Sequence, residues 1–307
     1  MSYVGLQEQI RKNNMRSMLL LIAFPLLVFL AVYAVMFFAL DVDFDEVNYY
    51  FIQAVPFVLI VVGVWFAIAY FSHSSMVNLA AGSHTLERKE HMRVYNLTEN
   101  LCMSVGMPMP KLQIMETPAL NAFASGLNDK TYTVTLTRGI IDKLNDEELE
   151  GVIAHELMHI RNRDVRLLVV TIIFVGIFAF ATQLLFRSFI YSGGGRSKNN
   201  KNDGKLVVVA LLVAVVAYLL TVLFKFALSR KREYLADAGA AEMTKKPWAL
   251  ASALRKISGN SSVESVKSDD IKEMFIDNTP DKTNFSIASL FSTHPPIEKR
   301  VKFLEQV

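Results

Sequence analysis

The sequence has very little cysteine and no strong excess of charge of either sign. Cys102 is the single cysteine among 307 residues, so the chain cannot form an intrachain disulfide, which fits a soluble portion in a reducing compartment. The 32 Lys and Arg and the 29 Asp and Glu leave a formal net charge of +3, and the basic residues are dispersed. No basic helix carries interleaved aromatic residues, so we expect no nucleic-acid partner.

Charge is almost absent from four long stretches, at residues 17–40, 49–71, 167–186 and 206–224. They raise the hydrophobic content to 52% and the mean hydropathy to +0.31, above the values of ordinary soluble domains. A helix of about 20 apolar residues crosses the hydrocarbon core of a bilayer, so we expect four membrane spans and a lipid bilayer as a partner. The first stretch exceeds the apolar region of a secretory signal and is interpreted as a permanent anchor.

The spans divide the chain into an N-terminal membrane anchor (1–72), two soluble segments (73–166 and 225–307) and a membrane hairpin between them (167–224). Together the soluble segments are large enough for one domain with a core, which the hairpin splits. Basic residues precede the first span and acidic residues follow it, so the N-terminus is expected to face the cytoplasm. The hairpin loop is itself basic, which conflicts with a full crossing; a shallow or re-entrant hairpin would remove the conflict.

The soluble segments predict a mainly α fold with a small antiparallel sheet. Alternating apolar residues predict strands at 111–115, 121–124 and 131–137, and helical spacing predicts helices at 86–105, 229–243, 248–258 and after Pro296. A further helix is expected to begin after Asn145 and to run through His159. Asn145 is a favoured N-cap residue, and Glu148 completes the pattern of a capping box.

Residues 155–159 read His-Glu-Leu-Met-His, which is the H-E-x-x-H pattern. On a helix, His155 and His159 lie one turn apart on the same face, where two imidazoles can bind one zinc ion. Glu156 projects beside that face and is placed to take a proton from a catalytic water. The pattern therefore predicts a zinc-dependent hydrolase, with a merely polar helix face as the alternative.

A catalytic zinc ion usually has three protein ligands and one open position, so a third ligand is required from elsewhere in the chain. Glu233 begins the segment Glu-Tyr-Leu-Ala-Asp, which is predicted to be helical. We expect Glu233 to be the third ligand and Asp237, one turn later, to accept the free ring N–H of a ligating histidine. The hairpin separates the two motifs in the sequence, so both of its ends must lie on one side of the membrane.

Four segments resemble, in the same order, the HtpX-type heat-shock membrane metalloproteases, which are relatives of the CAAX prenyl proteases. They are Asn121-Ala-Phe-Ala-Ser-Gly126, the H-E-x-x-H motif with Asp164 five residues on, Arg232-Glu-Tyr-Leu-Ala-Asp237, and Thr293-His-Pro-Pro-Ile-Glu-Lys-Arg300. The resemblance covers nearly the whole chain. It implies a zincin-like α+β catalytic domain, one zinc ion held by His155, His159 and Glu233, and Glu156 as the general base.

The resemblance also implies roles for residues outside the ligand set. His294 and Arg300 are expected near the metal, where they would help to stabilise the tetrahedral intermediate; a helix cap and a solvated helix charge are the alternatives. Asp164 either orients a ligand or neutralises Arg161 and Arg163.

A substrate site is implied at Asn121, Ala122, Phe123 and Ala124. An exposed sheet edge binds any extended peptide through backbone hydrogen bonds, with weak demands on its sequence. For Asn121 itself, a turn residue before a strand is the alternative.

The sequence thus predicts a four-span zinc metalloendopeptidase of the cell inner membrane, with its catalytic domain and both termini facing the cytoplasm. Its expected partners are polypeptides, in particular damaged or misfolded membrane proteins under heat or envelope stress. A dedicated processing protease for one membrane or lipidated partner is the alternative within the same chemistry. A non-catalytic zinc-bound scaffold is a further alternative, against which Glu156 and the lack of a fourth ligand argue.

Overall fold

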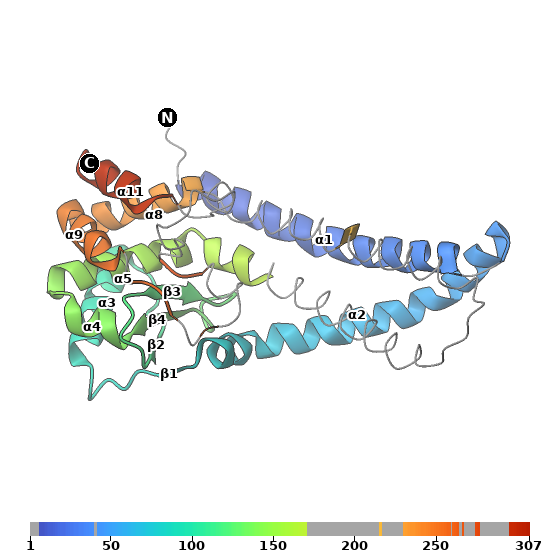
Figure 1. Ribbon diagram of the computed structural model, residues 1–307, viewed down its shortest axis with the longest axis horizontal. Coiled ribbons are helices and arrows are strands. Elements are labelled where there is room, and N and C mark those ends of the chain that lie inside the picture. The colour runs from blue at the N-terminus through green and yellow to red at the C-terminus, as the bar shows by residue number, and fades with distance from the viewer. Residues whose placement is uncertain are drawn as a thin grey trace, which may run out of the picture. The chain divides into compact units, whose positions relative to one another are not determined.

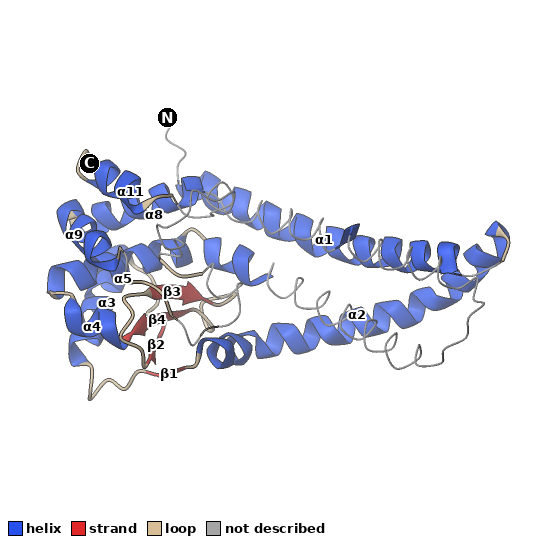
Figure 2. Cartoon of the chain, in the orientation of Figure 1, coloured by secondary structure: helices blue, strands red, loops and turns tan. Residues whose placement is uncertain are grey.

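The computed structural model describes residues 6–39, 42–170, 215–216, 230–258, 260–263, 266, 274–276 and 295–307. The chain separates into two compact units. The first comprises Met1–Asn14, His73–Val169 and Leu228–Val307, and the second Met15–Ser72 and Val170–Ala227. Helices make up most of the described residues (Figure 2).

Two long helices contain the first two expected membrane spans. α1 (Leu6–Ala39) includes the apolar segment Arg11–Ala34 with a mean hydropathy of 2.5, and α2 (Phe44–Ala81) reaches 2.4. Their apolar side chains are largely exposed, among them Leu30 at 63% and Phe57 at 69%. Both helices are therefore long and apolar enough to cross a membrane. The expected third and fourth spans lie outside the described residues except for 167–170 and 215–216, which are helical.

The first unit contains a four-stranded sheet in the order β1-β2-β4-β3 (Figure 1). Its strands are β1 (Ser83–Thr85), β2 (Lys111–Met115), β3 (Ala122–Ser125) and β4 (Thr133–Thr137). β2 and β4 pair in parallel, with Lys111 opposite Thr133, whereas β1 and β3 pair antiparallel with their neighbours. The sheet is mixed, so the prediction of an antiparallel sheet is wrong at its central pair.

The connection between β2 and β4 explains the mixed pairing. The intervening chain forms β3 at the sheet edge and returns antiparallel to it as β4, which takes the position between β2 and β3. Gly126 begins the return with a φ of +116°, and a Cβ atom there would lie 2.5 Å from the Thr131 carbonyl oxygen. β1 was not predicted, because its three residues, Ser-His-Thr, are too few and too polar to show strand periodicity.

The helices around the sheet are α3 (Met92–Val105), α4 (Arg138–Lys143), α5 (Asp146–Arg161), α8 (Arg230–Thr244), α9 (Pro247–Ile257) and α11 (Ile297–Leu304). α5 contacts β3 and β4 and also packs against α3, α8 and α9. The predicted helix at 86–105 is shorter than expected, because the Leu86 N–H donates to the Leu112 carbonyl and continues the sheet. The predicted helices near 229–243, 248–258 and after Pro296 are present as α8, α9 and α11.

The start of α5 confirms the predicted capping box. Asn145 Oδ1 accepts a hydrogen bond from the Glu148 backbone N–H at 2.9 Å, and Glu148 Oε2 accepts one from the Asn145 N–H at 3.0 Å. The same carboxylate accepts hydrogen bonds from Ser252 Oγ at 2.7 Å and Lys256 Nζ at 2.6 Å. Glu148 therefore both caps α5 and ties its first turn to α9.

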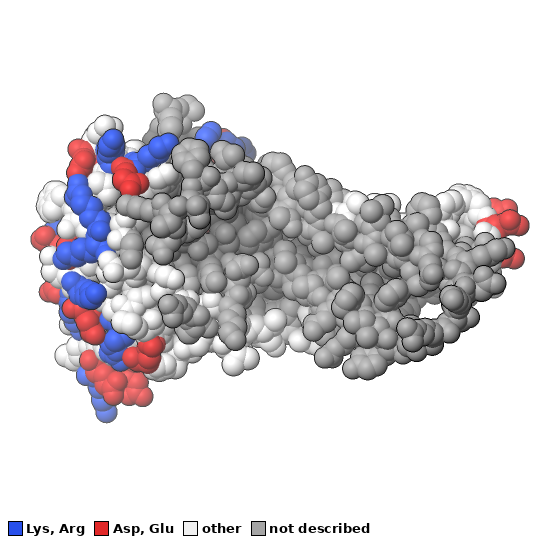
Figure 3. Space-filling view, viewed as in Figure 1, with Lys and Arg blue, Asp and Glu red and all other residues white. Residues whose placement is uncertain are grey.

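Charged side chains of both signs are interspersed over the first unit on the face drawn in Figure 3. Exposed ion pairs join Arg88 to Glu99 at 2.6 Å and Arg138 to Glu116 at 2.7 Å. Such solvated pairs contribute little to stability, typically about 0–1 kcal/mol. Among the described residues drawn in Figure 3, both signs of charge therefore occur side by side.

Candidate metal centre

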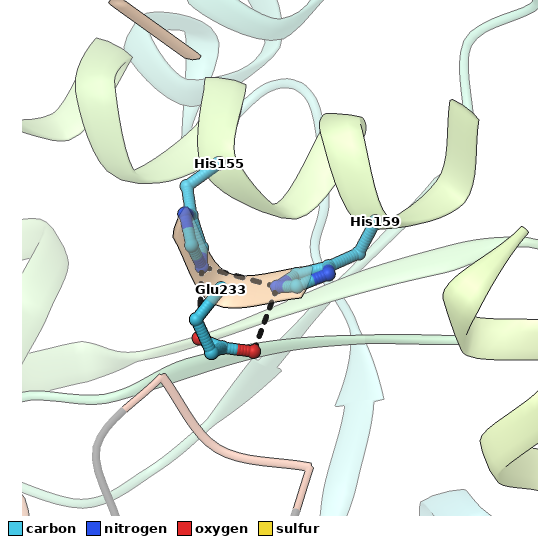
Figure 4. A group of neighbouring side chains, drawn as sticks. All are labelled: His155, His159 and Glu233. Atoms are coloured by element: carbon cyan, nitrogen blue, oxygen red, sulfur yellow. Dashed lines mark hydrogen bonds and ion pairs between the residues drawn. The ribbon is translucent and has the colours of Figure 1, made fainter. Parts of the chain in front are cut away.

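His155 and His159 extend from the same face of α5 towards a common point (Figure 4). Their Nε2 atoms are 3.1 Å apart, and the two ring planes are nearly perpendicular. His155 is fully buried, while the side chain of His159 is 15% exposed. The completely buried Ile153 and Leu157 lie on the opposite side of the helix, in the core. The core thus sets the direction in which both imidazoles point.

Glu233, in the first turn of α8, meets the two histidines from the other side (Figure 4). Its Oε2 lies 3.7 Å from His155 Nε2 and its Oε1 lies 3.6 Å from His159 Nε2. One possible ligand atom from each of the three residues lies within 4.8 Å of the others. Two imidazole nitrogens and a carboxylate oxygen form a donor set that suits zinc. The identity of the ion and the ligand roles stay predictions.

Asp237, one turn after Glu233 on α8, stands behind His155. Its Oδ1 lies 3.0 Å from His155 Nδ1, which leaves His155 Nε2 facing Glu233 and His159. Burial and the positive charge of Arg300 act to lower the pKa of His155, but Asp237 and Glu233 outweigh them and raise it to about 9. For Asp237, burial acts to raise the pKa, but Arg300 and His155 outweigh it and hold it below its usual range.

Arg300 reaches the same cluster from α11 and is fully buried. Its Nε and Nη2 donate to the two carboxylate oxygens of Asp237 at 2.9 and 2.7 Å, and its Nη1 donates to the Ile276 carbonyl at 3.0 Å. Nη1 also lies 3.6 Å from Glu233 Oε2. The interpretation of Arg300 as a solvated helix charge is therefore wrong. Its part in stabilising a tetrahedral intermediate stays a prediction.

Asp164 stands beside His159 in the way that Asp237 stands beside His155. Its Oδ2 lies 3.3 Å from His159 Nδ1. Its Oδ1 accepts a hydrogen bond from Asn13 Nδ2 at 2.7 Å and lies 3.7 Å from Arg232 Nη1. These contacts favour the interpretation of Asp164 as a residue that orients a ligand.

Glu156 is buried beside the two histidines, with 2% of its surface exposed. Burial is the largest cause that raises the pKa of its carboxyl group, and His155 and His159 offset part of that effect. A raised pKa brings a carboxylate closer to the range in which it takes and returns protons near neutral pH. Its role as general base stays a prediction.

The backbone and side chain of Asn121 are engaged within the chain. Its Nδ2 donates to the Ser261 carbonyl at 2.8 Å, and its Oδ1 accepts from the Ala122 N–H at 3.0 Å. The Ala122 carbonyl in turn accepts from the Ile276 N–H at 2.9 Å. Part of the β3 edge, where substrate was expected, is thus covered by residues 261 and 276 of the same chain.

The register of β3 decides which backbone groups reach its outer edge. The Thr137 N–H donates to the Asn121 carbonyl, so residues 121, 123 and 125 direct their backbone groups towards β4. Ala122 and Ala124 therefore direct theirs to the outer edge. The Phe123 ring packs edge-on against Phe275, with centroids 5.4 Å apart. The substrate role of the four residues stays a prediction.

Three residues that contact the cluster were not predicted from the sequence, and one predicted residue falls outside the described part of the chain. His294 lies outside the described residues. The cluster is also contacted by Asn13, Ile276 and Arg232, for which the sequence predicted no role. Arg232 is, however, the first residue of the motif that ends at Asp237. The sequence around Asn13 offers no signal of this contact, because Asn14, Met15 and Arg16 separate it from the first apolar run and Asn14 carries the same amide.

The sequence is similar to proteins of one family along most of its length. The profile of peptidase family M48 matches residues 88–307. A protease HtpX homolog of Bacteroides fragilis is 52% identical over 100% of both chains, and one of Dictyoglomus thermophilum is 37% identical over 98% of this chain and 94% of the relative. The crystal structure of S. mikatae Ste24p aligns with 98% of this chain and 66% of its own, at 20% identity and a TM-score of 0.46.

Proposed function

Because the chain belongs to peptidase family M48 and is a metallopeptidase, we propose that it is a zinc endopeptidase whose ion is held by His155, His159 and Glu233. The convergence of these three side chains, with ligand atoms within 4.8 Å of one another, carries the proposal. Three protein ligands leave one position of a tetrahedral zinc site open, as in catalytic rather than structural centres.

The proposed chemistry is hydrolysis of a peptide bond by water. Zinc held by His155, His159 and Glu233 would lower the pKa of a water to about 7 and would polarise the scissile carbonyl group. Glu156 takes a proton from the attacking water onto its carboxylate and returns it to the nitrogen of the departing amine. Asp237 and Asp164 hold the Nδ1 atoms of His155 and His159, so that both Nε2 atoms face the ligand site.

Arg300 is proposed to stabilise negative charge that develops at the reacting carbonyl. Its Nη2 lies 3.2 Å from His155 Nε2 and its Nη1 lies 3.6 Å from Glu233 Oε2, so a permanent positive charge borders the ligand set. A fixed charge in a buried site acts more strongly than in water. His294 is proposed as its partner on the strength of the motif that contains both residues.

We propose that substrates bind as an extended strand along the outer edge of β3, with the backbone groups of Ala124 as the principal contact. Backbone hydrogen bonds give affinity with little demand on sequence. That tolerance suits removal of damaged or misfolded membrane proteins, which share no single motif. We place the enzyme in the cell inner membrane with the catalytic unit facing the cytoplasm, because basic residues precede the first apolar helix.

The test compares full-length wild type with Glu156→Gln in detergent. The variant is expected to retain one zinc ion per chain and to lose about 100-fold or more of its hydrolysis of an unfolded protein, because a positioned general base contributes about 10²- to 10⁴-fold. Glu147→Gln, an exposed change on the same helix, serves as the matched control and should keep wild-type turnover. Near-wild-type turnover in Glu156→Gln would remove Glu156 as the base.

A further inference from the structure

We propose that Asn13, at the start of α1, is a positioning residue of the metal centre, which holds Asp164 in the orientation that supports His159. The inference rests on the proposed function, because His159 is taken to be a zinc ligand. It goes beyond that function by giving the N-terminal helix a part in metal binding.

The amide group of Asn13 holds two acceptors at once. Its Nδ2 donates to Asp164 Oδ1 at 2.7 Å and to the Asn162 carbonyl at 3.0 Å, and the residue is 1% exposed. A side-chain amide has two N–H donors, so both are used. The two hydrogen bonds join residues that are 151 and 149 positions apart in the sequence.

The two acceptors flank a residue with an uncommon backbone conformation. Arg163 has a φ of +59°, in the left-handed region that side chains other than glycine seldom adopt. Asn162, just before it, also ends α5, and Asp164 follows it. Asn13 therefore holds the turn that follows α5. This turn places the Asp164 carboxylate beside His159.

The two oxygens of Asp164 have different partners. Oδ2 faces His159 Nδ1 at 3.3 Å, whereas Oδ1 is held by Asn13. Arg232 Nη1 lies 3.7 Å from Oδ1, too far for a direct hydrogen bond in this geometry. Among the described residues, Asn13 is thus the short-range donor to Oδ1 that fixes the rotation of the carboxylate about its Cβ–Cγ bond.

Fixing that carboxylate also fixes the histidine. When Asp164 accepts the Nδ1 proton of His159, the lone pair of Nε2 is directed to the point shared with His155 and Glu233. Without Asn13 the carboxylate is free to rotate, and the ring loses its preferred tautomer and angle. The expected consequence is weaker zinc binding, in the lower part of the roughly 10- to 100-fold range seen when such supporting partners are removed.

The test measures zinc affinity of the full-length protein in detergent by competition with a chromophoric chelator, together with the melting temperature at saturating zinc. Asn13→Ala is expected to weaken zinc binding about 10-fold. The zinc-saturated variant should still unfold in one cooperative transition, several degrees below wild type, because two buried hydrogen bonds are lost. Asn14→Ala, which removes the neighbouring amide on the same helix, is the matched control and should bind zinc as wild type does. The Asn13→Ser variant keeps one hydrogen-bond donor at this position and should bind zinc with intermediate affinity. If Asn13→Ala does not fold, the comparison is made with Asn13→Ser.

A double-mutant cycle tests whether Asn13 acts through Asp164. In an Asp164→Ala background, adding Asn13→Ala should cause no further loss of zinc affinity. Unchanged zinc affinity in Asn13→Ala, equal losses in Asn13→Ala and Asn14→Ala, or full additivity with Asp164→Ala would each overturn the inference. Failure of the wild type to retain stoichiometric zinc would instead overturn the proposed function and, with it, this inference.

Discussion

Arg300 donates two parallel hydrogen bonds to Asp237, from Nε to Oδ2 at 2.9 Å and from Nη2 to Oδ1 at 2.7 Å. Asp237 links this pair to the candidate metal centre, since its Oδ1 also lies 3.0 Å from His155 Nδ1. Both charged groups are fully buried. Removing the partner of a buried charge lowers the stability of a protein far more than removing the partner of an exposed charge. We therefore expect the fold to depend on the Arg300–Asp237 pair.

Arg300→Met is expected to destabilise the protein by about 3–5 kcal/mol, because the change leaves Asp237 as a buried charge without its partner. The melting temperature in detergent should fall by roughly 2–4 °C for each kcal/mol lost. Lys299→Met removes an exposed positive charge from the same helix and should melt within a degree or two of wild type. Equal melting temperatures for the two variants would show that the Arg300–Asp237 pair stabilises the fold no more than an exposed charge does.

Glu233→Gln is expected to lower zinc affinity, because a neutral amide oxygen replaces the carboxylate ligand. The loss should exceed the roughly 10- to 100-fold that is typical when a residue that only hydrogen-bonds a ligand is removed. The change keeps the shape of the side chain, so zinc content per chain after dialysis is the measurement. Glu242→Gln, on the exposed part of the same helix, is the control. Stoichiometric zinc in both variants would exclude Glu233 from the ligand set.

Local patterns in the sequence predicted which side chains lie together at the candidate metal centre better than they predicted the sheet. The spacing of His155 and His159 and the capping box at Asn145 depend on contacts within one or two turns of a helix, which a sequence reveals directly. Glu233 required a motif from another segment. Strand alternation located β2 and β4 but says nothing about which neighbour each strand chooses, so their parallel pairing was missed.

Contacts between distant residues explain the remaining omissions. Asn13 lies 151 positions from Asp164, and its hydrogen bond has no periodic signature. Ile276 is an apolar residue whose contribution comes from its backbone N–H and carbonyl groups, which bond Ala122 and Arg300. A side-chain pattern carries no information about such backbone contacts. They become visible only when the fold brings the segments together.

Ala124→Pro tests the proposed substrate edge. Proline removes the N–H that Ala124 directs outward, at a position where an edge strand tolerates proline because that N–H is not part of the sheet. We expect KM for an unfolded protein substrate to rise roughly 2- to 10-fold, the worth of one backbone hydrogen bond, with zinc content unchanged. Ala124→Ser keeps the N–H and should keep the wild-type KM. A proline variant with wild-type KM would place the substrate elsewhere.

Glu148→Gln tests the junction of α5 and α9, away from the candidate metal centre. Burial acts to raise the pKa of Glu148, but hydrogen bonds from Lys256, Ser252 and the Asn145 N–H outweigh it and hold the pKa below the usual 4.5. The neutral amide weakens these charge-assisted bonds, so we expect a loss of about 1–3 kcal/mol at pH 7. The control, Glu147→Gln, changes an exposed neighbour in the same turn and should cost much less.

The pH dependence of that difference follows from the lowered pKa. A carboxyl group whose pKa is lower in the folded state than in the unfolded state stabilises the fold fully above the unfolded pKa, and this contribution disappears as the pH falls through the folded pKa. The difference in melting temperature between wild type and Glu148→Gln should therefore be constant above about pH 5.5 and shrink steadily below pH 4.5. Melting curves at a series of pH values provide the measurement. A difference that stays constant down to the most acidic pH at which both proteins fold would mean that the charge of Glu148 does not contribute to the junction.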